Sequence, residues 1–176
     1  MSPDAENKMK NIRIEKITLN IGSGIEAENA EKAVLLLTKI SGAKVIKTVT
    51  QRRIAAWKIR PGLPVGAMVT LRGKKAVEIL KALLHAVSFK VKKSSFTKNG
   101  FSFGVKEYIE IPGLKYDPKI GIIGLEAAVS LARPGFRIKR RKIKPAKMHY
   151  KHEISAEEGW DWAEKNLGIT AREEEE

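Results

Sequence analysis

The chain has 176 residues, of which 43% are hydrophobic and 31% are charged. This length is enough for one ordinary hydrophobic core and short for two, so we expect a single domain. The formal net charge is +14 at pH 7 and there is no cysteine, which excludes disulfides and thiolate metal sites. No apolar run approaches the roughly 18 residues of a membrane-spanning helix, so a cytoplasmic location is expected.

The positive charge is concentrated away from the C-terminus. Residues 153–176 contain nine acids and two bases, so residues 1–152 must carry about +21 to give the total of +14. Between Glu31 and Glu78 there are eleven lysines and arginines and no acid. Solubility does not require such an excess of positive charge. The commonest reasons for it are binding to nucleic acid and binding to an anionic membrane, and the membrane is the less well supported of the two.

The N-terminal part predicts a mobile tail over residues 1–9, followed by a strand. Apolar and polar residues alternate up to Ile21, and the alternation slips by one position near Glu15, which predicts a β-bulge. A Gly-Ser-Gly turn ends the strand. Apolar residues spaced as on one helical face then predict a helix over residues 26–41, capped by Gly42.

This strand, Gly-x-Gly turn and helix suggest a dinucleotide-binding turn as one alternative. The third glycine of that motif is absent, and Glu26, Glu28 and Glu31 would repel a phosphate at the helix N-terminus. A turn that reverses the chain over a sheet is the preferred interpretation.

A basic hairpin is the most distinctive stretch of the chain. Residues 44–53 and 65–72 read as its two strands, and an Arg-Pro-Gly turn at residues 60–62 stiffens the tip between them. Trp57 lies at this tip, where an exposed aromatic ring can stack on a nucleobase. The alternative is that Trp57 folds back against the core.

Further elements are expected in the second half of the chain. Apolar spacing predicts a helix over residues 73–88, and alternation predicts strands over residues 101–105 and 123–131. Residues 137–152 hold eight lysines and arginines and no acid, so they should be irregular and ordered only against RNA or a partner. Ser155 begins a capping box for a last helix.

Candidate catalytic groups are few. Glu107 and Glu110 fit a surface pair better than an acid and base pair, and His149 and His152 have no third ligand to complete a metal site. No phosphate-binding loop of the GxxxxGK[ST] type is present. We therefore expect no catalytic residue, no metal and no cofactor. An RNA-processing or RNA-modifying enzyme with the same basic face, or a free RNA chaperone, are the alternatives to a binding protein.

Three stretches carry a resemblance to a known family: LNIGSG near the start, WKIRPGLPVGAMVTLRG in the hairpin and IGIIGLEAAVSLARPGF later. Over roughly residues 11–168 the chain resembles the L5 family of large-subunit ribosomal proteins, in its archaeal and eukaryotic branch. The resemblance implies an α+β fold, in which helices back an antiparallel sheet and a long basic β-hairpin protrudes. From length and composition we expect a mobile tail (1–9), a single RNA-binding domain (10–170) and an acidic tail (171–176).

The resemblance also implies a structural role on the ribosome in the cytoplasm. Members of the family bind 5S rRNA in the central protuberance and help to attach it to the large subunit. The implied partners are 5S rRNA, large-subunit rRNA, the P-site tRNA reached by the hairpin tip, and the small-subunit head protein S13. The protein is expected to act as a monomer within the ribosome and to bind no membrane.

The expected site residues fall into three groups. Asn20 matches the family's N-x-G-x-G stretch, and Thr70 and Arg72 match its VTLR strand, whereas Ala43 replaces a glutamine that bacterial relatives use against RNA. The rRNA group is Asn20, Lys44, Lys47, Thr48, Arg52, Arg53, Thr70 and Arg72. The tRNA group at the tip is Trp57, Lys58, Ile59 and Arg60. The additional basic group is Arg137, Lys139, Arg140, Arg141, Lys142, Lys144 and Lys147.

Overall fold

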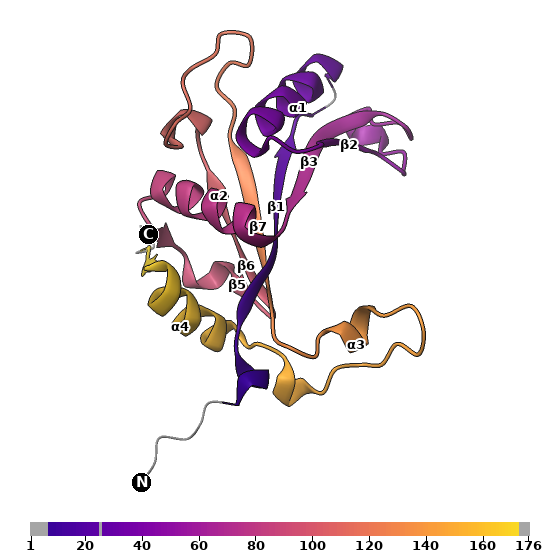
Figure 1. Cartoon of the computed structure of the whole chain (residues 1–176). Coiled ribbons are helices and arrows are strands. Elements are labelled where there is room, and N and C mark those ends of the chain that lie inside the picture. Colours follow the sequence, from indigo (N-terminus) through magenta and orange to yellow (C-terminus); the bar gives the residue numbers. More distant parts are fainter. Residues whose placement is uncertain (1–6, 25, 173–176) are drawn as a thin grey trace.

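The computed structural model describes residues 7–24 and 26–172 (Figure 1). Most of the expected N-terminal tail, residues 1–6, and the glutamates at 173–176 lie outside the described residues. Strands and helices follow one another along the chain as β1 (Arg13–Gly22), α1 (Ala27–Ser41), β2 (Ile46–Val49), β3 (Pro64–Leu71), α2 (Gly73–Ala86), β4 (Lys90–Val91), β5 (Phe96–Thr97), β6 (Gly100–Val105), β7 (Leu125–Ala132), α3 (Arg137–Arg140), α4 (Ala156–Leu167) and β8 (Thr170–Ala171).

Six of these strands form one antiparallel sheet in the order β2-β3-β1-β7-β6-β5. The helices α1, α2 and α4 lie on one side of this sheet (Figure 1). A separate parallel pair joins β4 to β8. The expected α+β class, with an antiparallel sheet backed by helices, is confirmed.

The core lies between the sheet and the helices. In β1, Ile17 and Leu19 are fully buried, and Ile21 is 2% exposed. Each such side chain contributes about 1.5–3 kcal/mol through burial. The pairing of β1 with β7 shifts register between Ile14 and Lys16, so the β-bulge predicted near Glu15 is confirmed. Beyond the bulge the polar residues of β1 all face away from the helices.

The turn after β1 reverses the chain, as the preferred interpretation required. The backbone N–H of Ser23 donates to the carbonyl oxygen of Val65 (2.9 Å), and Glu26 stands at the N-cap of α1. At the other end of α1, Gly42 adopts a left-handed conformation (φ 54°) and its N–H donates to Thr38 (2.8 Å). Glycine has no Cβ to clash in this conformation, which explains the helix stop.

The first arm of the hairpin is shorter than residues 44–53. Strand β2 ends at Val49, and the register of β2 and β3 shifts between Thr48 and Val49, where Pro64 lies opposite. Proline has no backbone N–H to donate to a ladder, so regular pairing stops there. Residues 50–63 form a separately folded tip.

The short strands β4, β5 and β8 were not predicted from the sequence. Each has only two residues, which is too few for an alternating pattern to be recognised. Strand β5 pairs with β6 through a tight turn in which Asn99 has a positive φ of 63°. The rings of Phe96 and Phe101 stack across this pair with centroids 4.7 Å apart. Strands β4 and β8 join segments about eighty residues apart in the chain, at Lys90 and Thr170.

In the long loop between β6 and β7, Asp117 connects the loop to α1. The side chain of Asp117 accepts a hydrogen bond from the backbone N–H of Lys119 (3.1 Å) and forms an ion pair with Lys39 on α1 (3.3 Å). The hydrogen bond from Lys119, together with the charge of Lys39, lowers the pKa of this carboxyl below its ordinary value.

The last helix begins as predicted. The Ser155 side chain accepts from the backbone N–H of Glu158 (3.2 Å), and the Glu158 carboxylate accepts from the N–H of Ser155 (3.3 Å). This reciprocal capping box confirms the predicted start of α4, and Gly168 stands at the far end of the helix in a left-handed conformation.

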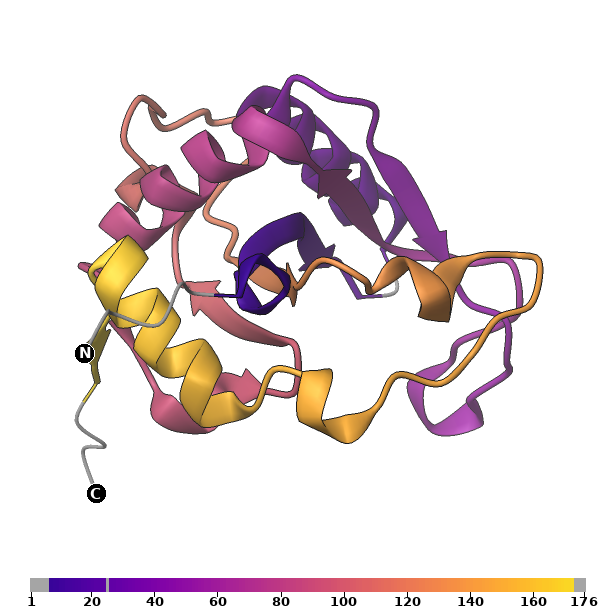
Figure 2. The ribbon, with the colours of Figure 1, turned by 60° about the horizontal axis from the view of Figure 1, so that its bottom comes forward.

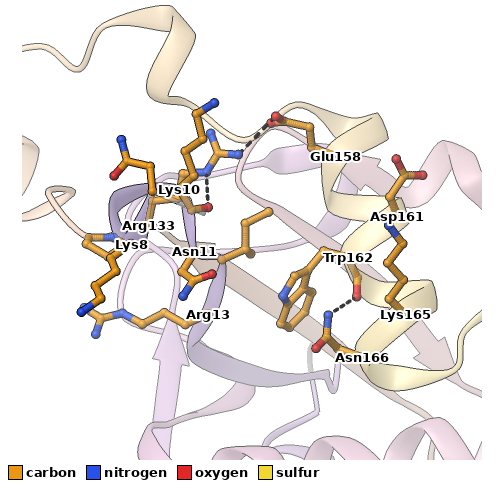
Figure 3. Close-up of a pocket in the computed structure, with 13 residues that line it drawn as sticks. Lys8, Lys10, Asn11, Arg13, Arg133, Glu158, Asp161, Trp162, Lys165 and Asn166 are labelled. Carbon is orange, nitrogen blue, oxygen red and sulfur yellow. Dashed lines mark hydrogen bonds and ion pairs between the residues drawn. The ribbon is translucent and has the colours of Figure 1, made fainter. Parts of the chain in front are cut away.

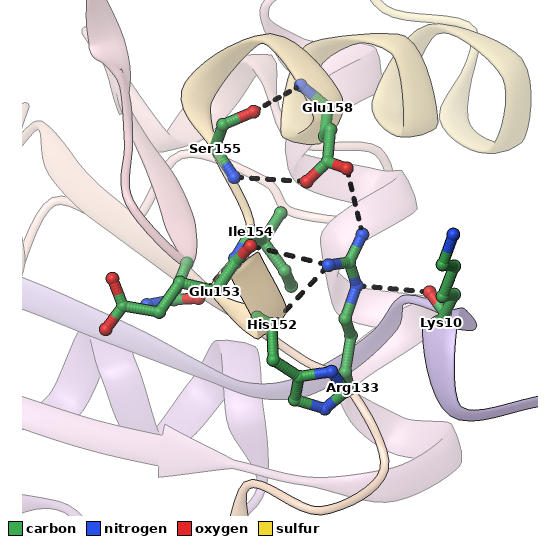
Figure 4. Close-up of polar contacts among 8 residues, drawn as sticks. Lys10, Arg133, His152, Glu153, Ile154, Ser155 and Glu158 are labelled. Carbon is green, nitrogen blue, oxygen red and sulfur yellow. Dashed lines mark hydrogen bonds and ion pairs between the residues drawn. The ribbon is translucent and has the colours of Figure 1, made fainter. Parts of the chain in front are cut away.

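Arg133, just after β7, is a buried charge that sequence reasoning did not single out. It is 6% exposed, and its guanidinium joins three segments of the chain (Figure 4). It donates to the carbonyl oxygen of Lys10 (3.1 Å) and to those of His152 (3.5 Å) and Glu153 (3.4 Å). Its other terminal nitrogen pairs with the capping-box Glu158 (3.2 Å).

Candidate nucleic-acid interface

Helices α1, α2 and α4 cover one face of the sheet (Figure 1), and we call the opposite face the open face. The antiparallel register sets Thr18 directly opposite Thr70 and Asn20 directly opposite Met68. Asn20 and Thr70 are exposed. Arg72 follows β3 in an extended conformation (φ −138°, ψ 163°), so its side chain continues the face of Thr70. The structure therefore brings Asn20, Thr70 and Arg72 onto one surface.

The other expected rRNA residues divide between two faces. Thr48 lies opposite Gly66, and Ile46 opposite Met68, so both belong to the open face. Lys47 faces the helix side, where its ammonium group pairs with Glu31 of α1 (3.4 Å). Lys44 precedes β2 and is exposed. The structure thus separates Lys47 from Thr48 by the alternation of side chains along a strand.

The outer part of the tip is a closed loop. Ile54 and Ile59 exchange two backbone hydrogen bonds, each 3.1 Å, around a 3-10 turn at Ala55–Trp57. Lys58 completes the loop in a left-handed conformation (φ 54°). Non-glycine residues seldom adopt this conformation, and they do so where surrounding contacts enforce it. The loop is therefore preformed.

The inner part of the tip is a type II turn held by one threonine. Pro61 and Gly62 (φ 84°) take its central positions, and the N–H of Leu63 donates to the carbonyl oxygen of Arg60 (3.2 Å). The hydroxyl of Thr50 donates to the same oxygen (2.6 Å), while its backbone N–H donates to Leu63 (3.0 Å). These bonds fix the direction in which the tip extends.

The tip presents an aromatic ring and free cations to solvent. Trp57 is 63% exposed, so it does not fold back against the core. Among residues 7–24 and 26–172, Arg52, Arg53, Lys58 and Arg60 form no ion pair. A large exposed ring beside unpaired cations is the kind of surface that binds RNA bases and phosphates.

Residues 137–152 are largely irregular, as expected, but they have contacts of their own, and we call residues 137–147 the basic segment. One helical turn, α3, opens it, and the Arg141 side chain donates to the carbonyl oxygen of Lys144 (2.7 Å). The backbone N–H of Ala146 donates a hydrogen bond to the carbonyl oxygen of Ile138 (3.3 Å). Phe136, immediately before the segment, is buried in the core.

An ion pair between Arg140 and Glu15 fastens the basic segment to the sheet. Glu15 is the residue of the β-bulge. A groove of about 510 Å³ runs between the end of the open face, at Lys16 and Ser130, and Lys139 of the basic segment. The open face and the basic segment are therefore parts of one surface. In both ribbon views the hairpin tip and the basic segment extend to the same side of the molecule (Figure 2).

We expect Glu15→Gln to weaken RNA binding about two- to threefold, although it removes a negative charge. Its carboxylate orients Arg140, and losing a partly exposed ion pair of this kind costs up to about 1 kcal/mol. A purely electrostatic effect would have the opposite sign, because a repelling charge is removed. Titration of labelled RNA at two salt concentrations distinguishes the positioning effect from the purely electrostatic effect. Glu78→Gln on α2 is the matched control. Tighter binding by Glu15→Gln would contradict the positioning role.

Sequence reasoning left some open-face residues out of the site. Lys16 and Thr18 lie on the same face of β1 as Asn20, and their alternation with Ile17 and Leu19 was the available signal. Glu126 of β7 lies opposite Asn20 and is exposed. No local pattern could have found Glu126 there, because only the β1–β7 register places it beside Asn20.

The histidines and acids of the described residues were candidates for a metal site. Within residues 7–24 and 26–172, no group of three or more histidines and acids is arranged to hold a metal ion. The Nε2 of His152 lies 2.9 Å from the carbonyl oxygen of Pro134, and His149 accepts from the N–H of Lys151 (3.3 Å). No helix of the described part is long and apolar enough to cross a membrane.

The geometry defines a class of protein: an α+β domain with an open polar face, a preformed basic tip and a basic segment, all suited to a polyanion. Comparison with known proteins agrees with this class, because the matching families are ribosomal. A family model described as "Ribosomal protein L5" matches residues 7–60, and a second model, which describes the C-terminus of the same ribosomal protein family, matches residues 64–158.

Relatives cover almost the whole chain. "Large ribosomal subunit protein uL5" of Nanoarchaeum equitans is 54% identical over 165 residues, which are 93% of this chain and 98% of the relative. The protein of that name from Sulfurisphaera tokodaii is 44% identical over 93% of this chain and 94% of its own. The one from Nitrosopumilus maritimus is 40% identical over 97% and 99%. The chain belongs to the ribosomal protein L5 family, which is structural and not enzymatic, and the expected family is confirmed.

Proposed function

We propose that this chain is a structural component of the large ribosomal subunit that binds 5S rRNA through its open face. Family membership supports the ribosomal role and the cytoplasmic, ribosome-bound location. The observation that carries the finer proposal is the convergence of Asn20, Thr70 and Arg72 on one exposed surface. Arginine offers a planar fork to phosphates, and small hydroxyl and amide groups bond to sugars and backbone.

The hairpin tip has a separate role in this proposal, which is to contact the P-site tRNA. Its closed outer loop is stiff and exposes Trp57, and it extends away from the sheet (Figure 1). A preformed loop loses little conformational entropy when it binds, which suits contact with an RNA that arrives and leaves repeatedly. The expected bridge to the small-subunit head protein S13 belongs to the same proposal.

The basic segment extends the open face and is proposed to bind neighbouring large-subunit rRNA. Within the described residues, only Arg140 of its arginines and lysines is engaged in an ion pair. Ile143 stands 78% exposed among them, so a packing surface accompanies the charge. Bound in this way, the segment and the sheet would help to attach 5S rRNA to the subunit.

A competition experiment tests the proposal against a free RNA chaperone, which would bind RNA without preference. We expect unlabelled 5S rRNA to displace labelled 5S rRNA at least about a hundredfold more effectively than an unrelated structured RNA of equal length. Specific binding usually exceeds non-specific binding by about a thousandfold or more, so this margin is modest. Equal competition, or absence of the protein from large subunits after fractionation at physiological salt, would refute the proposed function.

A further inference from the structure

A groove of about 1190 Å³ lies between the N-terminal segment and α4 (Figure 3). Lys8, Lys10 and Arg13 stand on one side of it, and Trp162, Lys165 and Asn166 of α4 on the other (Figure 3). None of the open-face, tip or basic-segment residues lines this groove. It is thus a surface that the proposed function leaves unused.

The charge of the groove favours an anionic strand. Within the described part of the chain, Lys8, Lys10, Arg13 and Lys165 form no ion pair. Of the two acids in the lining, Glu158 is neutralised by Arg133 (3.2 Å) and only Asp161 remains. Four free cations therefore face one free carboxylate, and the cations lie on both walls.

The apolar part of the groove lining favours a nucleobase over a peptide. Ile12, Pro134 and Trp162 are half-buried there, and the indole is a flat surface on which a base can stack. The amide nitrogen of Asn166 donates to the carbonyl oxygen of Trp162 (2.9 Å), which leaves the amide oxygen of Asn166 free to accept from a base. Single-stranded RNA is bound by this combination of aromatic platform, amides and cations.

The two walls are held at a fixed separation by the buried Arg133. Its guanidinium donates to the carbonyl oxygen of Lys10 in one wall and pairs with Glu158 in the other (Figure 4). Because both bonds come from one planar group, the walls are fixed before any ligand arrives. A preformed groove binds without the entropic cost of ordering its walls.

We propose that this groove binds an unpaired RNA strand, with a base stacked on Trp162 and phosphates on the lysines of the two walls. The inference rests on the proposed function only in taking the partner to be RNA. It assigns the chain a further RNA-binding surface, separate from the open face, the hairpin tip and the basic segment, so that the protein can hold one more RNA segment.

The test uses the variant Trp57→Phe/Trp160→Phe, in which Trp162 is the remaining one of the three tryptophans. An unlabelled oligouridylate of about ten nucleotides, within the usual range of such sites, should quench its fluorescence saturably. Replacing Lys8, Lys10 and Lys165 with glutamine should lower the salt slope of this quenching by about 2, since each single-strand phosphate contact contributes about 0.7. The control K74Q/K81Q/K115Q removes the same charge elsewhere and should leave the slope unchanged.

A second measurement uses the wild-type chain, in case the double tryptophan variant folds poorly. Photo-crosslinking to RNA that contains 4-thiouridine should label the α4 peptide around Trp162. RNA binding with no quenching and no such crosslink would overturn the inference. Quenching by an oligoglutamate peptide but not by RNA would also overturn it, in favour of an acidic protein partner. Arg72→Gln should retain the quenching while its binding of 5S rRNA is weakened, so the two proposals can fail independently.

Discussion

Replacing Arg133 with methionine is expected to lower the free energy of unfolding by about 3 kcal/mol. The substitution removes the donors to Lys10, His152 and Glu153 and the partner of Glu158. Removing one member of a buried pair costs about 3–5 kcal/mol. Here the carboxylate of Glu158 is half-exposed and can be rehydrated, which places the cost near the lower limit.

Urea denaturation followed by circular dichroism measures this loss. The denaturation midpoint should fall, while the dependence of stability on urea stays the same if unfolding remains two-state. Arg137→Met is the matched control, because Arg137 is exposed and forms no ion pair within the described residues, so a change below about 0.5 kcal/mol is expected. If the two variants lose equal stability, the network around Arg133 is not what joins the three segments.

Replacing Arg72 with glutamine should weaken binding of isolated 5S rRNA about tenfold or more, whereas replacing Trp57 with alanine should change it less than about twofold. Arg72 offers charge-assisted hydrogen bonds, each contributing about 1.5–3 kcal/mol, and tenfold corresponds to about 1.4 kcal/mol. Trp57 stands on the closed outer loop, away from the open face. Its loss should instead reduce the occupancy of P-site tRNA on reconstituted subunits.

Filter binding with labelled 5S rRNA at several salt concentrations makes the comparison. Loss of one phosphate contact at Arg72 should lower the salt slope by about 1. Thr70→Val keeps the shape of the side chain and should weaken binding by about 1 kcal/mol. Lys81→Gln, an exposed residue of α2 on the helix side of the sheet, serves as the charge control. A larger effect of Trp57 than of Arg72 on 5S rRNA would reverse the roles assigned to the two ends of the hairpin.

The local elements followed closely from the sequence. Alternation predicted the bulge near Glu15, and the glycine at position 42 and the capping box at Ser155 predicted helix boundaries that the structure confirms. Such signals are local, because a cap or a strand face is determined by residues within a few positions. Two-residue strands such as β5 lie below the length at which alternation can be recognised.

Which residues make up the candidate site could be predicted from the sequence only in part. Asn20 and Thr70 were singled out through the family motifs that they match, and alternation along a strand places its polar residues on a common face. Their meeting on one surface depends on the register of β1 and β3, which sets Thr18 against Thr70. In the sequence, nothing distinguishes Lys47 from the other cations of the hairpin. Its ion pair with Glu31 depends on how α1 packs against the sheet.

By itself the sequence determined the charge, the family resemblance, the alternation of faces and the stiffness of the tip, because each is carried by composition or by neighbouring residues. Only the tertiary structure decided which cations are free, which face of the sheet stays uncovered and where a groove forms. Arg133 shows the physical reason. Its partners lie between 19 and 123 positions away in the chain, so no local pattern records them. Burial makes those distant contacts obligatory, since an unpaired guanidinium in the interior would be too costly.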